Sequence, residues 1–86
     1  MSSLDQLPFR TPAMVVAVRW DALSPSEARR LRALGLDEGV SVEVLHGAPI
    51  ARDPIAVRIG RMTVALRRAH AAVVQVDRAA LDLAAQ

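Results

Sequence analysis

Apolar side chains recur at every second position in five stretches of the chain, which is the period of a half-buried β-strand. The predicted strands are residues 13–20, 40–45, 55–59, 62–66 and 73–76. In the first of them, we expect Met14, Val16, Val18 and Trp20 to share the face that packs on the core. The stretches are short and no strand–helix–strand rhythm links them, so the pattern favours a small β structure.

A helix is predicted between the first two strands. In Ser24-Pro25-Ser26-Glu27, the hydroxyl of Ser24 is placed to accept the backbone N–H of Glu27, the Glu27 side chain to reach back, and Pro25 to take the first helical position. A left-handed Gly35 would end the helix and bring Leu36 over Leu31. The arginines expected on the outer face are Arg29, Arg30 and Arg32.

Glycine and proline mark the predicted connections. Gly60 stands at the first central position of a two-residue loop between residues 55–59 and 62–66, where it fits a type II′ hairpin turn. The stretch from Gly47 to Pro54 holds three turn-forming residues and is predicted to be an ordered bend. Residues 67–72 are expected to form a single helical turn.

These elements predict a mainly β fold with one short inserted α-helix. A small SH3-like barrel of about five antiparallel strands suits them, with an OB-like barrel as the other option, because curling the sheet removes edges that invite aggregation. Residues 1–76 are assigned to this barrel domain. Residues 77–86 form an alanine-rich tail, predicted to be a marginal helix or disordered because short isolated helices are unstable in water.

The charge pattern gives little support for nucleic-acid binding. The sequence pI is about 11.0, yet 11 arginines face 9 acidic residues for a net charge of only +2. Because the chain has no lysine, tyrosine or cysteine, few groups titrate between histidine and arginine, and this raises the pI. Acidic residues interleaved with the arginines weaken the positive electrostatic field that would attract a phosphate backbone. Phe9 and Trp20 are the only aromatic residues on which bases could stack.

Neither catalysis nor a dedicated metal site is predicted. His46 and His70 are the only histidines, and no serine, histidine and acid set stands at a suggestive spacing. Metal-binding spacings of histidine and cysteine are missing too, so no catalytic, cofactor-binding or metal-ligating residue is expected. No signal-peptide core and no apolar stretch of spanning length occurs, which predicts a soluble cytoplasmic protein without membrane insertion.

One ordered series of motifs is more specific than these patterns. It consists of Arg30-Leu31-Arg32-Ala33-Leu34-Gly35-Leu36, Gly39, Val42-Glu43-Val44, Ala48-Pro49, Asp53-Pro54-Ile55, Val57-Arg58-Ile59-Gly60, Val64-Ala65-Leu66-Arg67-Arg68 and Ala71. In this order and spacing, the series resembles the FeoA family from roughly Leu4 to Val76. One departure stands before the first strand, where FeoA chains commonly carry glycine and this chain has Arg10-Thr11-Pro12.

The resemblance implies a small cytoplasmic SH3-like barrel that accompanies the ferrous iron transporter FeoB by contacting its cytoplasmic GTP-binding part. It implies a regulator, with no cofactor and no catalysis. The same barrel occurs in iron- and manganese-dependent repressors, so a free-standing domain related to theirs is one alternative. A small arginine-rich nucleic-acid-binding barrel is the other, and a homodimer stays open.

Partner contact would use loops and helix ends, because these commonly carry recognition on a rigid barrel. We therefore expect contacts from the helix face with its arginines, from an exposed apolar helix end and from the proline-containing loop. The candidate partner-binding residues are Arg29, Arg30, Arg32, Leu34, Leu36, Pro49, Asp53 and Pro54.

Overall fold

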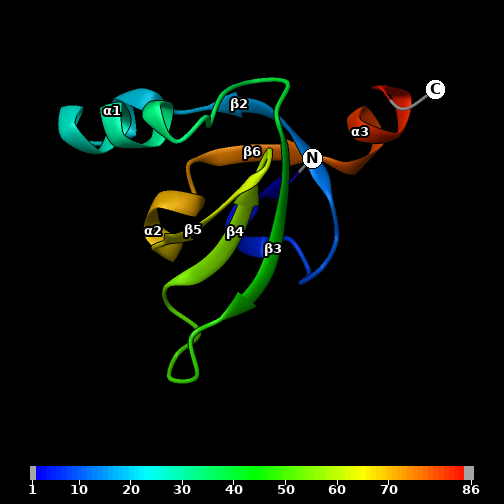
Figure 1. The fold of residues 1–86 in the computed structure, drawn as a ribbon. Coiled ribbons are helices and arrows are strands. Elements are labelled where there is room, and N and C mark those ends of the chain that lie inside the picture. Colours follow the sequence, from blue (N-terminus) through cyan, green and yellow to red (C-terminus); the bar gives the residue numbers. More distant parts are fainter. Residues whose placement is uncertain (1, 85–86) are drawn as a thin grey trace.

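A computed structural model describes residues 2–84 and shows a curled sheet with short helices around it (Figure 1). The strands are β1 (Ser2–Ser3), β2 (Ala13–Val18), β3 (Ser41–Gly47), β4 (Ile55–Ile59), β5 (Met62–Leu66) and β6 (Val74–Asp77). The α-helices are α1 (Pro25–Ala33), α2 (Arg68–Ala71) and α3 (Arg78–Ala84), and two 3₁₀ turns span Leu4–Gln6 and Trp20–Ala22.

All described strand pairs are antiparallel, in the order β1-β6-β2-β3-β4-β5. The predicted mainly β, SH3-like architecture is confirmed, with six strands where about five were expected. The additional strand is β1, in which Ser2 pairs with Val76 and Ser3 with Gln75. Two serines carry no hydrophobic period, so the sequence pattern could not predict this strand.

The predicted core face of β2 is wrong in its first half. Ala13 and Val15 are fully buried, whereas Met14 and Val16 are only partly buried. The register shifts between Val15 and Ala17, which leaves Val16 without a paired residue on β6. This bulge reverses the alternation, so Val18 also packs against the core.

Trp20 was expected at the end of this strand, on its core face. Instead it begins the 3₁₀ turn Trp20–Ala22 and is partly buried against the core. The guanidinium carbon of Arg32 lies 4.3 Å from the centre of its ring, which is the geometry of a cation–π contact.

Helix α1 begins and ends as its sequence predicts. The Ser24 hydroxyl accepts the backbone N–H of Glu27 at 3.2 Å, and Pro25 is the first helical residue. Gly35 has a φ of 97°, and the N–H of Leu36 donates to the carbonyl of Leu31 at 3.0 Å. The expected return contact from the Glu27 side chain is wrong, because that carboxylate pairs with Arg30 and His70.

The loop between β3 and β4 projects from one end of the sheet (Figure 1). Its base is fixed by a hydrogen bond from the N–H of Ala48 to the carbonyl of Pro54 at 3.0 Å. Gly47 lies so close to Arg52 that a Cβ on Gly47 would stand 2.7 Å from the Arg52 Cβ. The peptide bond between Asp53 and Pro54 is cis. The predicted ordered bend is therefore confirmed, and glycine is required at its base.

Two turns explain particular residues of the sequence. Gly60, in the loop between β4 and β5, has a φ of 60°, as the predicted hairpin turn needs. Arg10 has a φ of 62°, in the left-handed region that favours glycine. The position where this chain departs from the family pattern is thus one where glycine would relieve backbone strain.

The core lies between the curled sheet, α1 and the chain before β2. Its buried side chains are Leu4, Leu7, Ala13, Val15, Leu31, Leu36, Val42, Val44, Ile55, Val57, Ile59, Leu66, Ala71, Val74 and Val76. Within the part of the chain that the structure describes, no buried side-chain polar atom lacks a hydrogen-bond partner. The barrel is thus a rigid support for surface features.

Candidate partner-binding surface

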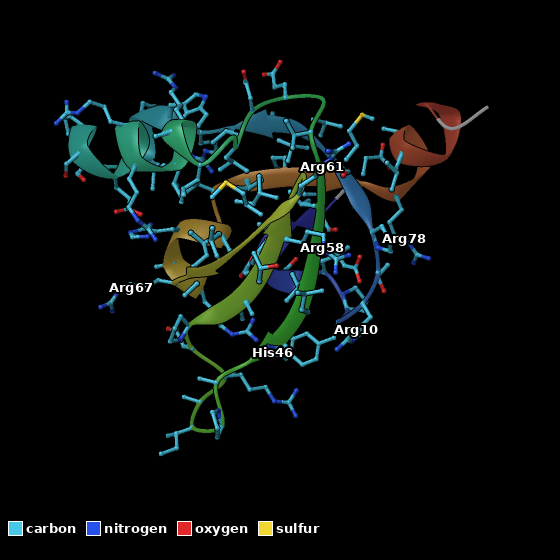
Figure 2. All side chains as sticks on the ribbon, viewed as in Figure 1. Arg10, His46, Arg58, Arg61, Arg67 and Arg78 are labelled. Atoms are coloured by element: carbon cyan, nitrogen blue, oxygen red, sulfur yellow. The ribbon has the colours of Figure 1, made fainter. Side chains whose placement is uncertain are left out.

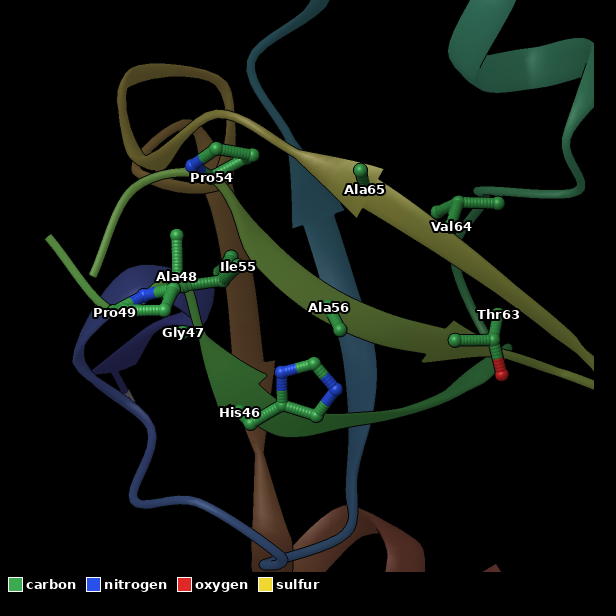
Figure 3. Close-up of a pocket in the computed structure, with 10 residues that line it drawn as sticks. All are labelled: His46, Gly47, Ala48, Pro49, Pro54, Ile55, Ala56, Thr63, Val64 and Ala65. Atoms are coloured by element: carbon green, nitrogen blue, oxygen red, sulfur yellow. The ribbon is translucent and has the colours of Figure 1, made fainter.

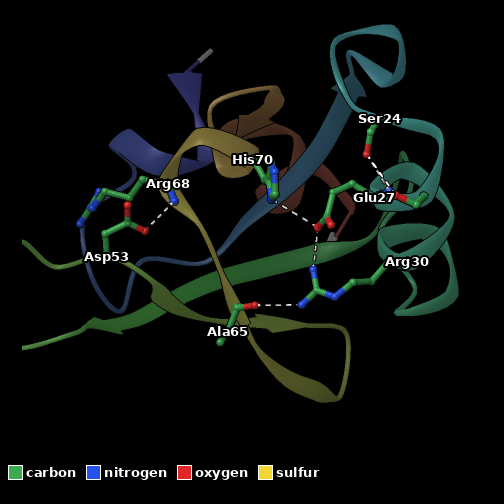
Figure 4. Close-up of polar contacts among 8 residues, drawn as sticks. Ser24, Glu27, Arg30, Asp53, Ala65, Arg68 and His70 are labelled. Carbon is green, nitrogen blue, oxygen red and sulfur yellow. Dashed lines mark hydrogen bonds and ion pairs between the residues drawn. The ribbon is translucent and has the colours of Figure 1, made fainter.

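The three arginines of α1 have different surroundings. Arg30 pairs with Glu27 at 2.7 Å, and its Nη2 donates to the carbonyl of Ala65 on β5 at 3.2 Å (Figure 4). Arg32 lies over the ring of Trp20. Arg29 is exposed and makes no hydrogen bond or ion pair with any side chain that the structure describes. Of the three, Arg29 is therefore the one whose charge is free for a partner.

The expectation of an exposed apolar end on this helix is wrong for Leu36. Leu36 is fully buried, because the left-handed Gly35 turns the chain back and packs Leu36 against the core. Leu34 is half-buried and also packs against the core. Neither leucine therefore presents a large apolar surface.

Asp53 has a structural contact. Its Oδ1 accepts the backbone N–H of Arg68 at 3.0 Å, at the first residue of α2 (Figure 4). The Arg68 side chain donates in turn to the carbonyls of Arg52 at 2.8 Å and Asp5 at 2.9 Å. This network joins the β3–β4 loop, α2 and the chain before β2, so it fixes the loop that carries Pro49 and Pro54.

Pro49 and Pro54 line a shallow apolar hollow of about 330 Å³ on the outer face of β3, β4 and β5 (Figure 3). Its floor is made of small residues, chiefly Ala56 and Ala65, and His46 and Thr63 form part of its wall. Small side chains at these strand positions leave the space that larger ones would fill. We refer to this feature as the apolar hollow.

A second hollow of about 270 Å³ adjoins it and is polar. It shares Pro54 and Ala65 with the apolar hollow and is otherwise lined by Glu27, Arg30, Arg67 and His70. The Nδ1 atom of His70 stands 3.3 Å from a Glu27 carboxylate oxygen. Arg67 is exposed and has no ion pair with any described side chain. We refer to this feature as the polar hollow.

Two residues of this surface escaped the sequence prediction. Ile50 is 86% exposed at the tip of the β3–β4 loop, the most exposed large hydrophobic side chain among those described. Its position beside Pro49 in a turn-rich stretch was the available signal. Arg67 belongs to the predicted helical turn and to the family-like motif series, but it was not among the predicted partner-binding residues. Its place in the polar hollow depends on tertiary packing that no local pattern encodes.

The candidate metal ligands and the two histidines are dispersed over the described part of the chain. Among residues 2–84, no three histidine, cysteine, aspartate or glutamate side chains come together as a metal-binding group. His46 and His70 line different hollows, so they do not form a catalytic pair. In the same part of the chain, no helix has the length and apolar character needed to cross a bilayer.

The fold defines the class of protein, which is a small SH3-like barrel. The chain belongs to the FeoA family, since a model of the FeoA domain matches residues 2–78. This confirms the resemblance seen in the sequence. A comparison with curated protein sequences gave no match.

Solved structures agree with this assignment. FeoA of Stenotrophomonas maltophilia, determined with zinc and described as an SH3 domain protein and candidate ferrous iron transport activating factor, is 35% identical, with a TM-score of 0.76 over 92% of this chain and 93% of that one. FeoA of Chlorobium tepidum is 36% identical, with a TM-score of 0.77 over 88% and 69%. A manganese-dependent transcriptional repressor, 21% identical with a TM-score of 0.74 over 88% and 40%, shares the fold.

Proposed function

We propose that this chain is a non-catalytic accessory protein of ferrous iron uptake, acting in the cytoplasm by contact with the GTP-binding part of a FeoB-type transporter. The observation that carries the proposal is the family match over residues 2–78. It is supported by a relative that aligns over 92% of this chain and 93% of its own and is described as a candidate ferrous iron transport activating factor. The apolar hollow and the exposed Ile50 at the loop tip support a contact role, because apolar surface of this kind is buried readily on association.

The geometry narrows the residues that would make this contact. Of those predicted from the sequence, Arg29, Pro49 and Pro54 are exposed and make no side-chain hydrogen bond, ion pair or cation–π contact with the described residues. Ile50 joins them, because a bulky apolar side chain at a loop tip buries area readily on association. Arg30, Arg32 and Asp53 are exposed too, but their side chains contact other parts of the chain at the surface, so their substitution would also act through those contacts.

The experiment is an uptake assay in cells. A strain lacking the gene for this chain, and the same strain carrying it on a plasmid, are supplied with radiolabelled ferrous iron. The proposal expects uptake to fall in the deletion strain and to recover with the wild-type chain. It expects recovery to be partial with Ile50→Ser, which leaves the core untouched. Equal uptake in all strains that contain the transporter would reject the proposed function.

A further inference from the structure

Strand β5 is a free edge of the sheet among the described strands, since it pairs with β4 alone. The N–H of Gly60 points toward β3, since it donates to the carbonyl of Ser41. The backbone N–H and C=O of the preceding residue, Ile59, therefore point the other way, toward β5. Backbone groups alternate in direction along a strand, so the N–H and C=O of Thr63 and Ala65 point away from the sheet. The bond that Arg30 donates to the carbonyl of Ala65 agrees with this direction.

This edge keeps three backbone groups for a further strand: the N–H and the C=O of Thr63, and the N–H of Ala65. Both residues are exposed. Such a row of donors and acceptors is the template on which extended peptides add to a sheet. The remaining group, the C=O of Ala65, already accepts the hydrogen bond from Arg30, and this contact marks one end of the open stretch.

The hollows lie where the side chains of an added strand would fall. Thr63 and Ala65 line the apolar hollow, and Ala65 also lines the polar hollow. Side chains of an added strand alternate between the two faces of the sheet, so those on the outer face would meet the apolar hollow. A side chain near the Leu66 end would reach Arg67.

Two arginines at opposite ends of β5 decide what kind of strand fits (Figure 2). Arg61 precedes the strand and Arg67 follows it, and neither forms an ion pair with any side chain that the structure describes. In a two-fold antiparallel pairing of two copies about Val64, Arg61 of one copy would stand opposite Arg67 of the other. Like charges placed opposite each other destabilise a strand pair. This register therefore disfavours a second copy, and the two unpaired arginines favour a strand with carboxylates at its ends.

We propose that the β5 edge binds an extended acidic peptide segment, which adds as a further strand along Thr63–Ala65 and places its carboxylates at Arg61 and Arg67. The main-chain bonds supply binding without sequence preference, and the two arginines and the apolar hollow supply selectivity. The inference goes beyond the role in iron uptake, because it concerns the form of the bound segment and holds whichever protein carries it.

The test uses a blocked seven-residue peptide in which threonine and valine alternate between two terminal glutamates, titrated into the isotopically labelled full-length chain. Proton exchange of the Thr63 and Ala65 amides is followed by NMR. Both amides are expected to become protected as the peptide binds, whereas the Val64 amide, which faces β4, changes little. A peptide with lysines in place of the glutamates, and one with N-methylated amides, are expected to bind at least about tenfold more weakly.

Thr63→Pro is the matched variant, because proline is tolerated on an edge strand where the missing N–H faces solvent. It is expected to keep the fold, judged from the amide spectrum, and to lose peptide binding. Arg67→Ala and Arg61→Ala are each expected to weaken binding about two- to fivefold, as exposed ion pairs do. Arg78→Ala removes the same charge from the start of α3, away from the edge (Figure 2), and is expected to bind as wild type.

Two results would overturn the inference. One is the absence of protection at Thr63 and Ala65 with millimolar peptide, which the wild-type chain reports even if Thr63→Pro fails to fold. The other is peptide binding to Thr63→Pro at wild-type strength. A concentration-dependent dimer that Thr63→Pro abolishes would instead assign the edge to a second copy and would also reject the acidic peptide.

Discussion

The carboxylate of Asp53 caps α2 from a distant part of the chain, accepting the N–H of Arg68 at 3.0 Å. The Arg68 side chain returns the contact by donating to the carbonyl of Arg52 at 2.8 Å. Loop and helix therefore hold each other in place, and Pro49, Ile50 and Pro54 are presented on a fixed loop.

Removing the Asp53 carboxylate should destabilise the fold modestly. Asp53→Ala leaves a helix N–H without its acceptor, which costs about 1 kcal/mol at a helix start. Asp53→Asn keeps an acceptor oxygen and should lose less. Urea denaturation of the three proteins measures the difference. Equal stability of Asp53→Ala and wild type would show that water replaces the cap without cost.

Arg68 should contribute more to stability than its neighbour Arg67. Arg68→Ala removes two charge-assisted bonds to the carbonyls of Arg52 and Asp5, and we expect a loss of about 1.5–3 kcal/mol. Arg67→Ala removes an equal charge from an exposed side chain and should change stability by less than about 0.5 kcal/mol. Thermal unfolding of both variants provides the comparison, and similar melting temperatures would contradict the network.

Substitution of the two leucines after α1, Leu34 and Leu36, should lower the stability of the fold by different amounts, because they differ in burial. Leu36→Ala opens a cavity in the core and should cost about 2–5 kcal/mol, a large part of the stability of a small domain. Leu34→Ala removes a half-buried side chain and should cost less. Denaturant titration measures both free energies. A Leu36→Ala loss no larger than that of Leu34→Ala would mean that Leu36 is not in the core.

Arg10→Gly should stabilise the protein by up to about 1 kcal/mol, because glycine adopts a positive φ without the clash that a Cβ makes. The N–H that donates to the carbonyl of Val44 at 2.7 Å is retained. Arg10→Ala is the control, since it removes the side chain but keeps the Cβ. A melting temperature of Arg10→Gly at or below that of Arg10→Ala would contradict the strain.

Local signals predicted what local chemistry determines. Helix α1 begins after Ser24 and ends before Gly35 as expected, and Gly60 forms the predicted turn between β4 and β5. These features were predictable because caps and turns depend on a few neighbouring residues. The face of β2 was assigned wrongly because a bulge at Val16 depends on pairing with β6, which lies far along the chain. Sequence period alone does not report such a register shift.

The candidate site residues also fall into those that the sequence predicts and those that depend on tertiary contacts. Arg29, Pro49 and Pro54 are exposed as their residue types suggest, whereas Leu36 and Asp53 take roles set by tertiary contacts. The two hollows and the free edge of β5 join residues from α1, the β3–β4 loop and α2. Their assembly follows from the curl of the sheet and has no local signature.

The central claim, a contact with the transporter, is tested most directly by calorimetric titration of the purified chain into the purified cytoplasmic GTP-binding part of a FeoB-type transporter. Saturable binding with a Kd of about 1–100 µM is expected, in the range of transient regulatory contacts. Ile50→Ser and Arg29→Ala should weaken it, and Arg78→Ala, the same charge change at the start of α3, should not. No heat of binding from a folded wild-type chain at about 1 mM would contradict the account.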